Sequence, residues 1–291
     1  MKSKVLVIVG PTASGKSDLA VRLAKKFGGE VISADSRQVY KGLNVGTGKI
    51  TKKEMRGVKH HLLDVANPKK QFSVRDFVSK ASEALKLIEA NEALPIVVGG
   101  TGFYIDALTG AASLPEVPPN KKLREKLGKK SAETLFKMLE KKDTARAQTI
   151  DKHNKVRLIR ALEIIAALGR VPSSNKIQET RYKFIYIGLK SENLDERIKK
   201  RLLKRIPGIL RETKNLSFKR AYELGLEYRY AALCLKNKLS KQEFIEELNT
   251  AIRQYSKRQM TWFKRNKKIK WFKQNEYKHI EKYAKVALKG D

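Results

Sequence analysis

Residues 10–17 form a short segment whose residue types are suited to binding phosphate. They read GPTASGKS, which fits the pattern G-x-x-x-x-G-K-[ST], and they follow the apolar run VLVIV. In such a loop, backbone N–H groups and a helix N-terminus face phosphate oxygens, Lys16 supplies a positive charge, and Ser17 can hold Mg²⁺. The segment therefore predicts a phosphate site, but it leaves open which molecule carries the phosphate.

Two further segments fall where a ligand of this loop would lie. In an open α/β sheet, ligands bind beyond the carboxyl ends of the strands. Two of those ends read ADSRQ at residues 34–38 and GGTGFY at residues 99–104, so we expect Asp35 and Thr101 to flank the phosphate loop. An ATPase or GTPase would end an apolar strand in an aspartate that helps to hold Mg²⁺. The second segment offers no such aspartate, although Asp35 could take that part in a kinase-like site.

The elements that must position these residues alternate between strands and helices. We predict strands at 4–9, 30–36 and 94–100. The first helix should begin near Lys16 and end at the glycines of FGG, and the second should begin with a capping box of Ser73 and Asp76. This alternation predicts an α/β fold, a P-loop NTPase-like parallel sheet with helices on both faces, plus a helical insertion domain.

The insertion is predicted from a change in pattern after Gly110. Helical patterns without strand signals fill residues 120–168, GRVPSSN at 169–175 breaks the chain, and YKFIYIGL at 182–189 returns to a strand. We therefore expect three parts, and from residue 194 onward we expect only helices. The parts are residues 1–114 as the first part of the P-loop α/β core, 115–180 as a tRNA-binding helical insertion, and 181–291 as a return to the core with C-terminal helices. The last long helix carries Phe244, Leu248, Ile252 and Tyr255 on one stripe.

Charge and composition narrow the class of partner. The 291 residues include 64 Lys and Arg against 30 Asp and Glu, a formal net charge of +34, which favours nucleic acid, although a solvated basic surface would look the same. No run approaches the roughly 20 apolar residues of a membrane span. The single cysteine, Cys234, permits no internal disulfide, so a reducing cytoplasm fits and no membrane is expected.

Seven segments together resemble one family, the bacterial-type tRNA dimethylallyltransferases. In chain order they are GPTASGKS, ISADSRQVYKGLNVGTGK, HHLLDV, FSVRDF, PIVVGGTGFYIDAL, RLIRALEI and RQYSKRQMTWF. The resemblance as a whole spans about residues 4–272. The resemblance implies transfer of a dimethylallyl group from dimethylallyl diphosphate to the N6 amine of the adenosine on the 3′ side of the anticodon. It further implies Mg²⁺ as cofactor and the anticodon stem-loop of tRNA as partner, and we expect a monomer.

The resemblance also assigns roles to single residues. It implies that Asp35 is the general base, that Thr101 positions the target base, and that Arg201 lies near the diphosphate. The implied diphosphate contacts are Gly10, Thr12, Ala13, Ser14, Gly15, Lys16 and Ser17. The implied tRNA contacts are Asp35, Ser36, Arg37, Gln38, Thr101, Arg124, Arg157, Arg160, Lys257, Arg258 and Gln259.

The chain departs from the family pattern at three places. Lys152-His153-Asn154 replaces a Pro-Asn-Asp turn, Glu227 replaces a glycine, and GTGKI at 46–50 replaces the more usual GTAKP.

The C-terminal aromatic residues could be a base-stacking surface or core: Trp262, Phe263, Trp271 and Phe272. The rival functions are a small-molecule or nucleotide kinase that uses ATP and a non-catalytic RNA-binding module.

Overall fold

The computed structural model describes residues 2–172 and 180–290 and divides the chain into two compact units. Residues 1–110 and 179–291 form the first unit, and residues 111–178 form the second. The end of the predicted break, residues 173–175, lies outside the described residues. The units are described in turn.

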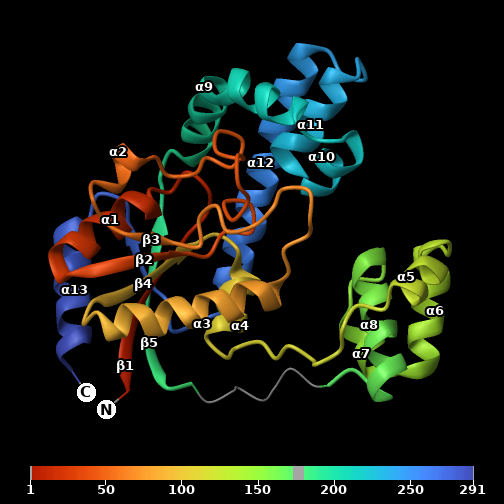
Figure 1. Ribbon diagram of the computed structural model, residues 1–291, viewed down its shortest axis with the longest axis horizontal. Coiled ribbons are helices and arrows are strands. Elements are labelled where there is room, and N and C mark those ends of the chain that lie inside the picture. The colour runs from red at the N-terminus through yellow and green to blue at the C-terminus, as the bar shows by residue number, and fades with distance from the viewer. Residues whose placement is uncertain (1, 173–179, 291) are drawn as a thin grey trace. The chain divides into compact units, whose positions relative to one another are not determined.

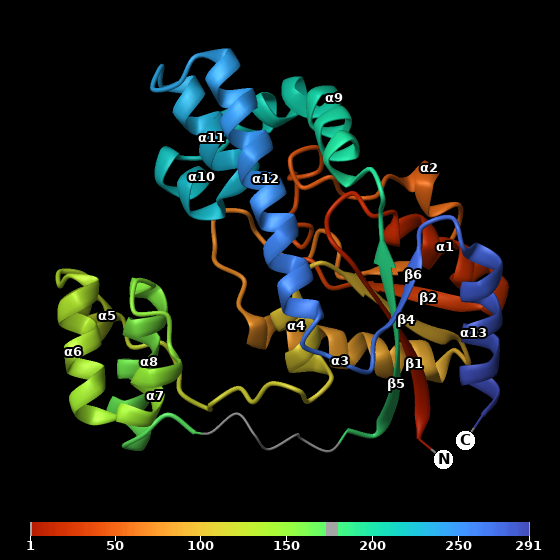
Figure 2. The same cartoon turned by 180° about the vertical axis from the view of Figure 1, so that it is seen from behind.

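The first unit is built on a six-stranded parallel sheet with strand order β3-β2-β4-β1-β5-β6. Strands β1 to β5 are labelled in Figure 1 and β6 in Figure 2. The predicted parallel α/β sheet is thus confirmed, and the phosphate loop follows a central strand. The strands are β1 (Ser3–Val9), β2 (Gly29–Ser33), β3 (His60–His61), β4 (Leu94–Gly99), β5 (Tyr182–Lys190) and β6 (Lys270–Lys273).

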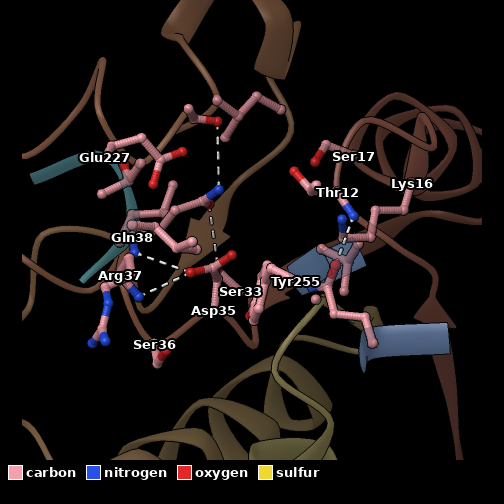
Figure 3. Close-up of a pocket in the computed structure, with 18 of the residues that line it drawn as sticks. Thr12, Lys16, Ser17, Ser33, Asp35, Ser36, Arg37, Gln38, Glu227 and Tyr255 are labelled. Carbon is pink, nitrogen blue, oxygen red and sulfur yellow. Dashed lines mark hydrogen bonds between the residues drawn. The ribbon is translucent and has the colours of Figure 1, made fainter. Parts of the chain in front are cut away.

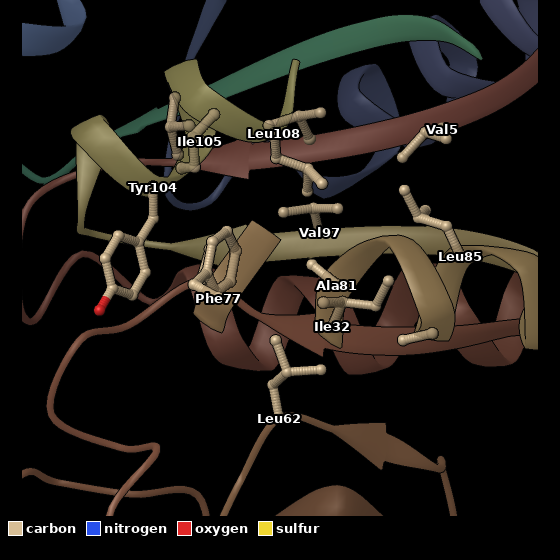
Figure 4. Close-up of a cluster of buried hydrophobic side chains, with 14 of the residues drawn as sticks. Val5, Ile32, Leu62, Phe77, Ala81, Leu85, Val97, Tyr104, Ile105 and Leu108 are labelled. Carbon is tan, nitrogen blue, oxygen red and sulfur yellow. The ribbon is translucent and has the colours of Figure 1, made fainter. Parts of the chain in front are cut away.

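Helices cover both faces of this sheet. On one face, α3 (Val74–Ala90) and α4 (Gly102–Leu108) pack on Val5 and Val97, as Figure 4 shows. On the other lie α1 (Lys16–Phe27) and α13 (Tyr277–Lys289), as Figure 2 shows. Their apolar side chains pack with the alternate residues Leu6 and Ile8 of β1. Because both faces are covered, β1 reads as a continuous apolar run.

The local signals for helix ends are confirmed. Helix α1 begins at Lys16 and ends against Gly28, which has φ 63° in the left-handed region that glycine tolerates. Helix α3 begins with the predicted capping box, in which the Ser73 hydroxyl accepts from the Asp76 N–H and the Asp76 carboxylate accepts from the Ser73 N–H. Both ends are therefore determined by neighbouring residues.

A group of C-terminal helices stands at the carboxyl end of the sheet. They are α9 (Leu194–Lys214), α10 (Phe218–Leu224), α11 (Leu226–Leu235) and α12 (Lys241–Phe263), and the short α2 (Lys52–Met55) lies in the long loop after β2. Phe244, Leu248 and Ile252 are buried against α9 and α11, as the stripe predicts. Tyr255, the fourth member of the stripe, is only half-buried.

The expectation of helices alone after residue 194 is wrong, because β6 adds a parallel strand beside β5. Phe272 of β6 is buried against Tyr283 of α13, with ring centroids 5.5 Å apart. Phe263 is also buried, and Trp262 and Trp271 pack against the same core. The core interpretation of the four aromatic residues therefore fits the structure better than a free stacking surface.

The second unit contains helices and no strand among its described residues, in line with the predicted helical pattern. Its helices are α5 (Lys121–Gly128), α6 (Ala132–Lys142), α7 (Thr144–Thr149) and α8 (Lys155–Leu168). Leu135, Leu139, Leu158 and Leu162 form a small core of their own. Across the described part of both units, no helix is long and apolar enough to cross a membrane.

Candidate active site

The phosphate loop connects β1 to α1, and its backbone is open to an anion. Gly15 is the N-cap residue of α1 with φ 91° and makes no side-chain capping bond, so the helix N-terminus is available to a ligand. A side chain at Gly15 would be strained and would also meet the amide of Gln274. Ser14 is fully buried and its hydroxyl has no hydrogen-bond partner. Ser14 is not among the residues that line the cavity described below, and its contact with phosphate stays a prediction.

Lys16 is the charged group of this loop. Its Nζ lies 3.2 Å from the carbonyl oxygen of Pro11. Burial lowers the pKa of Lys16 to about 8, the negative charge of Asp35 acts in the opposite direction, and the positive charge of Arg201 lowers it further. The charges of Asp35 and Arg201 therefore both act on the Lys16 ammonium group.

A cavity of about 270 Å³ lies beside the loop. Figure 3 shows Lys16, Thr12 and Ser17 on one side of this cavity, with Asp35, Arg37 and Gln38 across from them. The apolar part of its wall comes from Ile50, Leu63, Val98, Leu224, Leu226 and Ile252. The cavity therefore offers a phosphate end, a carboxylate and an apolar surface within one enclosure.

Asp35 follows the carboxyl end of β2, as the strand-end rule predicts. Its Oδ1 accepts from the backbone N–H of Arg37 at 2.9 Å and of Gln38 at 3.4 Å. This turn holds the carboxylate in the pocket wall, and Oδ2 takes part in neither bond. A fixed carboxylate with one oxygen outside the turn can accept a proton from a bound group.

Thr101 connects the ends of two strands. Its Oγ1 accepts from the backbone N–H of Ser36 at 3.0 Å, and its backbone N–H donates to the Ala34 carbonyl at 3.3 Å. Thr101 also forms a hydrogen bond with the side chain of Tyr255. Tyr255 lines the pocket, whereas Thr101 is not among the lining residues. Burial raises the pKa of Tyr255 to about 12, so the phenol stays neutral at physiological pH. The structure thus brings Thr101 beside the Asp35 turn, and its partner Tyr255 lines the cavity.

Arg201 reaches the pocket from α9. Its Nη2 donates to the carbonyl oxygen of Gly48 at 2.9 Å, and both residues line the cavity with Lys16. Gly48 has φ 60°, and a side chain there would overlap the Arg201 guanidinium. The GTGKI departure therefore places a glycine where this arginine needs room.

The residues predicted to contact tRNA fall into two groups in the first unit. Ser36, Arg37 and Gln38 line the pocket, whereas Lys257 and Arg258 are exposed on α12. Gln259 also lines the pocket, but only 7% of it is exposed. Its Oε1 accepts from the Thr12 N–H and its Nε2 donates to the Gly100 carbonyl, both at 2.9 Å. Gln259 therefore connects the phosphate loop to the end of β4.

In the second unit, two of the predicted tRNA contacts already have a partner. Arg124 donates to both oxygens of the buried Glu163 carboxylate, each at 2.8 Å, and Arg160 donates to the same carboxylate. Arg157 is exposed, and its backbone N–H donates the capping bond to the side-chain oxygen of Asn154. The assignment of all three to tRNA stays a prediction.

Sequence reasoning did not single out several lining residues. Tyr255 was recognised only as part of an apolar stripe, and Glu227 and Gly48 only as departures from a pattern. Each comes from a loop or helix that is distant from the phosphate loop in sequence. No periodicity or spacing in the sequence could have placed them there.

The described residues hold no group of three or more His, Cys, Asp or Glu side chains suited to a metal. Ser17 and Asp35 line the same cavity. So sparse a set of oxygen donors fits Mg²⁺, since Mg²⁺ retains waters and takes further ligands from substrate phosphates.

Fold and pocket together define a P-loop α/β protein whose phosphate loop faces a carboxylate across a partly apolar cavity. The chain belongs to the IPP transferase family, whose family model matches residues 38–266. It is 38% identical over 310 aligned residues to a tRNA dimethylallyltransferase of Thermoanaerobacter sp. (strain X514), with 99% of this chain and 98% of that protein covered.

Two solved structures are similar over the whole chain. One is the full-length tRNA isopentenylpyrophosphate transferase from Bacillus halodurans, with a TM-score of 0.74 and 34% identity over 99% of this chain and 97% of that one. The other is a eukaryotic dimethylallyltransferase acting on tRNA, with a TM-score of 0.79 and 26% identity over 98% of this chain and 77% of that one.

Proposed function

We propose that this chain transfers the dimethylallyl group of dimethylallyl diphosphate to the N6 amine of the adenosine 3′-adjacent to the anticodon of tRNA, with release of diphosphate. The observation that carries the proposal is the convergence of Lys16, Arg201 and Asp35 on one cavity that also has an apolar wall. The match to tRNA dimethylallyltransferases over nearly the whole chain supports the choice of substrates.

The phosphate end of the cavity suits a departing diphosphate. When the bond between the allylic carbon and oxygen breaks, its electron pair stays with the diphosphate, whose negative charge rises. The N–H groups at the start of α1, Lys16 and Arg201 are placed to stabilise that charge. A Mg²⁺ ion held by Ser17 would supply further charge neutralisation there.

Asp35 suits the other half of the reaction. The exocyclic amine of adenine is a poor nucleophile because its lone pair is delocalised into the ring. As the amine forms the new C–N bond its N–H becomes acidic, and the Asp35 carboxylate takes the proton, a role typically worth about 10²–10⁴ in rate. In the whole step the allylic C–O bond breaks, a C–N bond forms, and one proton passes from the amine nitrogen to Asp35.

The apolar wall suits a five-carbon chain. Ile50, Leu63 and Val98 come from three separate segments and line the same cavity as the phosphate loop. A prenyl group bound against these side chains is removed from contact with water. The exclusion of water protects the allylic electrophile from hydrolysis.

The RNA contacts are proposed on the basis of charge and exposure. A base inside an anticodon loop must leave its stack to reach a pocket, so the adenosine is flipped. We assign backbone contacts to the exposed Lys257 and Arg258 of α12 and to Arg157 of the second unit, in keeping with the net charge of +34. A monomer in the cytoplasm is proposed with the same function.

The test is a transfer assay with an anticodon stem-loop, labelled dimethylallyl diphosphate and Mg²⁺, run beside an ATP control. Asp35→Asn should lower kcat by about 10²–10⁴ while the Kd for RNA changes little, since only the proton acceptor is lost. Phosphate transfer from ATP would instead support the kinase. RNA that binds tightly and is never modified by any prenyl donor would support the binding module.

A further inference from the structure

The loop at residues 44–48 forms part of the pocket wall and rests on one face of α9. Arg201, Arg205, Gly208 and Glu212 recur along α9 at a spacing that places them on a single helix face. All four face the loop, and Val45 packs where a side chain at Gly208 would lie. The loop is thus held by a helix more than 150 residues away in sequence.

Glu212 holds the N–H groups of this loop. Its Oε1 accepts from the backbone N–H of Asn44 at 2.9 Å and of Val45 at 2.7 Å. Its Oε2 accepts from the Gly46 N–H at 2.8 Å and from the Tyr228 hydroxyl at 2.9 Å. A carboxylate that receives four donors is held firmly and holds the donors in turn. Burial, and then the charge of Glu212, raise the pKa of Tyr228, so the phenol remains a donor.

Arg205 holds the carbonyl groups of the same loop. Its Nε donates to the Val45 carbonyl at 2.6 Å, and its Nη2 donates to the Gly46 carbonyl. The same guanidinium pairs with Glu227 at 3.2 Å, with both side chains about 15% exposed. Because Glu227 lines the pocket, the departure from glycine at this position adds an anchor for Arg205.

The end of the loop sets the position of Arg201. The Gly48 carbonyl accepts from Arg201 Nη2 at 2.9 Å and, at 3.4 Å, from the side-chain amide of Gln38 in the Asp35 turn. Thr47 and Gly48 also line the cavity. A shift of the loop would therefore move the carbonyl that orients the arginine and would alter the wall opposite the phosphate loop.

We propose that Glu212 is a positioning residue for the transfer reaction: it fixes the 44–48 loop so that the Gly48 carbonyl holds the Arg201 guanidinium toward the diphosphate. Glu212 touches no substrate and acts through Arg201. The inference rests on the proposed function, because it assigns the diphosphate to the site that Arg201 faces. A carboxylate that only stabilised the fold would change the amount of folded protein and leave the chemistry of each folded molecule unchanged.

The test is a double-mutant cycle of Glu212→Gln with Arg201→Ala. The amide of Glu212→Gln presents N–H groups where Gly46 and Tyr228 donate, so the loop loses the bond from Gly46 and Glu212 loses its bond from Tyr228. Alone, Glu212→Gln should lower kcat by about 10- to 100-fold, because a small misplacement of a charged group is costly. It should also weaken the binding of inorganic diphosphate, measured by calorimetry, by about tenfold. In the Arg201→Ala background the same change should have little further effect on either quantity.

Controls separate positioning from folding. Glu223→Gln removes a carboxylate from α10 that is half exposed and pairs with Arg220, so it should leave kcat and diphosphate affinity unchanged. Tyr228→Phe removes one of the four donors and leaves the carboxylate, so it should still lower kcat and diphosphate affinity a few-fold, and it remains usable if Glu212→Gln folds poorly. Thermal unfolding of every variant gives the folded fraction by which kcat is divided.

Two results would overturn the proposal. One is a Glu212→Gln protein, or a Tyr228→Phe protein if the first does not fold, with a lowered Tm but an unchanged kcat and diphosphate Kd per folded molecule. The other is an equal loss in the presence and absence of the Arg201 side chain. If the parent chain bound diphosphate but prenylated no RNA, the proposed function would fail, whereas the cycle could still be read from diphosphate affinity.

Discussion

The charge of Lys16 is sensitive to pH near the physiological range. Burial lowers the pKa of Lys16 to about 8, the carboxylate of Asp35 raises it, and Arg201 lowers it again. The ammonium form binds diphosphate, so the contribution of Lys16 is present below pH 8 and is lost as pH rises through it. We predict that diphosphate affinity at pH 9 is about tenfold weaker than at pH 7, since one pH unit above the pKa leaves about a tenth of the lysine charged.

The measurement is calorimetric titration of inorganic diphosphate at the two pH values, with Lys16→Met as the control. Diphosphate itself also titrates in this range, and the control carries that contribution without the lysine. The difference between the parent chain and Lys16→Met therefore isolates the lysine. An equal pH dependence in both proteins would show that the charge of Lys16 does not govern the site.

Gln259 tests whether a pocket residue acts on the phosphate loop or on RNA. Gln259→Leu removes both amide bonds and leaves the Thr12 N–H and the Gly100 carbonyl without this partner. We expect a loss of about 1–3 kcal/mol of stability and weaker diphosphate binding, because buried polar groups are costly to leave unpaired. RNA affinity in the absence of donor should change little.

The matched control is Arg258→Ala, one residue earlier on α12 and exposed. It should weaken RNA binding and leave diphosphate binding unchanged. The opposite pattern, in which Gln259→Leu weakens RNA and spares diphosphate, would establish the predicted tRNA contact for Gln259. Filter binding with the stem-loop and calorimetry with diphosphate give the two affinities.

At the scale of elements, Glu163 joins the helices of the second unit through a buried carboxylate. Only 1% of its side chain is exposed, and it accepts from Arg124, Arg160 and the backbone N–H of Asn120. Burial alone would raise its pKa, but these donors outweigh burial and lower the pKa from the ordinary 4.5 to about 2. Its stabilising effect is thus complete above about pH 4.5 and is lost as pH falls through 2.

We predict that Glu163→Leu destabilises the second unit by about 3 kcal/mol, since one partner of a buried ion pair is lost. The variant should also lose most of the stability change between pH 4.5 and 2. Urea unfolding of the full chain followed by circular dichroism, at pH 6 and pH 3, checks both effects. Glu133→Gln on α6, which removes an exposed carboxylate from an i,i+4 pair, is the control and should leave the stability nearly unchanged. A similar pH dependence in parent and variant would contradict the prediction.

The elements also show which features a sequence can predict. The ends of α1 and α3 depend on Gly28 and on the Ser73 capping box, which are local, and both were predicted. Strand β6 has only four residues, KWFK, and a pattern of that length cannot be distinguished from a turn or a helix end. It becomes a strand because β5 offers a free edge and α13 covers Phe272. Its formation therefore depends on tertiary contacts.

The candidate site, too, combines features that depend on neighbouring residues with features that depend on tertiary contacts. Residues 10–17 were recognised from spacing, and Asp35 from its place after a strand, because both rules concern neighbouring residues. Arg201 was assigned only through family resemblance, since nothing near it in sequence refers to a phosphate. The roles of Gln259 and Glu212 depend on hydrogen bonds to segments more than 150 residues away and could not be inferred from the sequence.

At the scale of the whole molecule, positive charge is not confined to the pocket. The chain carries 34 more Lys and Arg residues than Asp and Glu residues, and the pocket accounts for few of them. Such an excess attracts a polyanion over its length and releases counterions from it. A small diphosphate, bound by a few fixed groups, involves far fewer counterions, so the two ligands of the proposed reaction should respond differently to salt.

We predict that the Kd for the anticodon stem-loop rises steeply with salt. If about six phosphates are neutralised, the slope of log K against log[salt] is about −4 to −5, because each contact contributes about −0.7 to −0.9. Diphosphate affinity at constant Mg²⁺ should show a slope no steeper than about half of that. Lys257→Gln, on the exposed face of α12, should reduce the RNA slope by about one unit and leave the diphosphate slope unchanged. An RNA slope near zero, or one that Lys257→Gln does not alter, would mean that the basic surface is only solvated and that recognition is confined to the pocket.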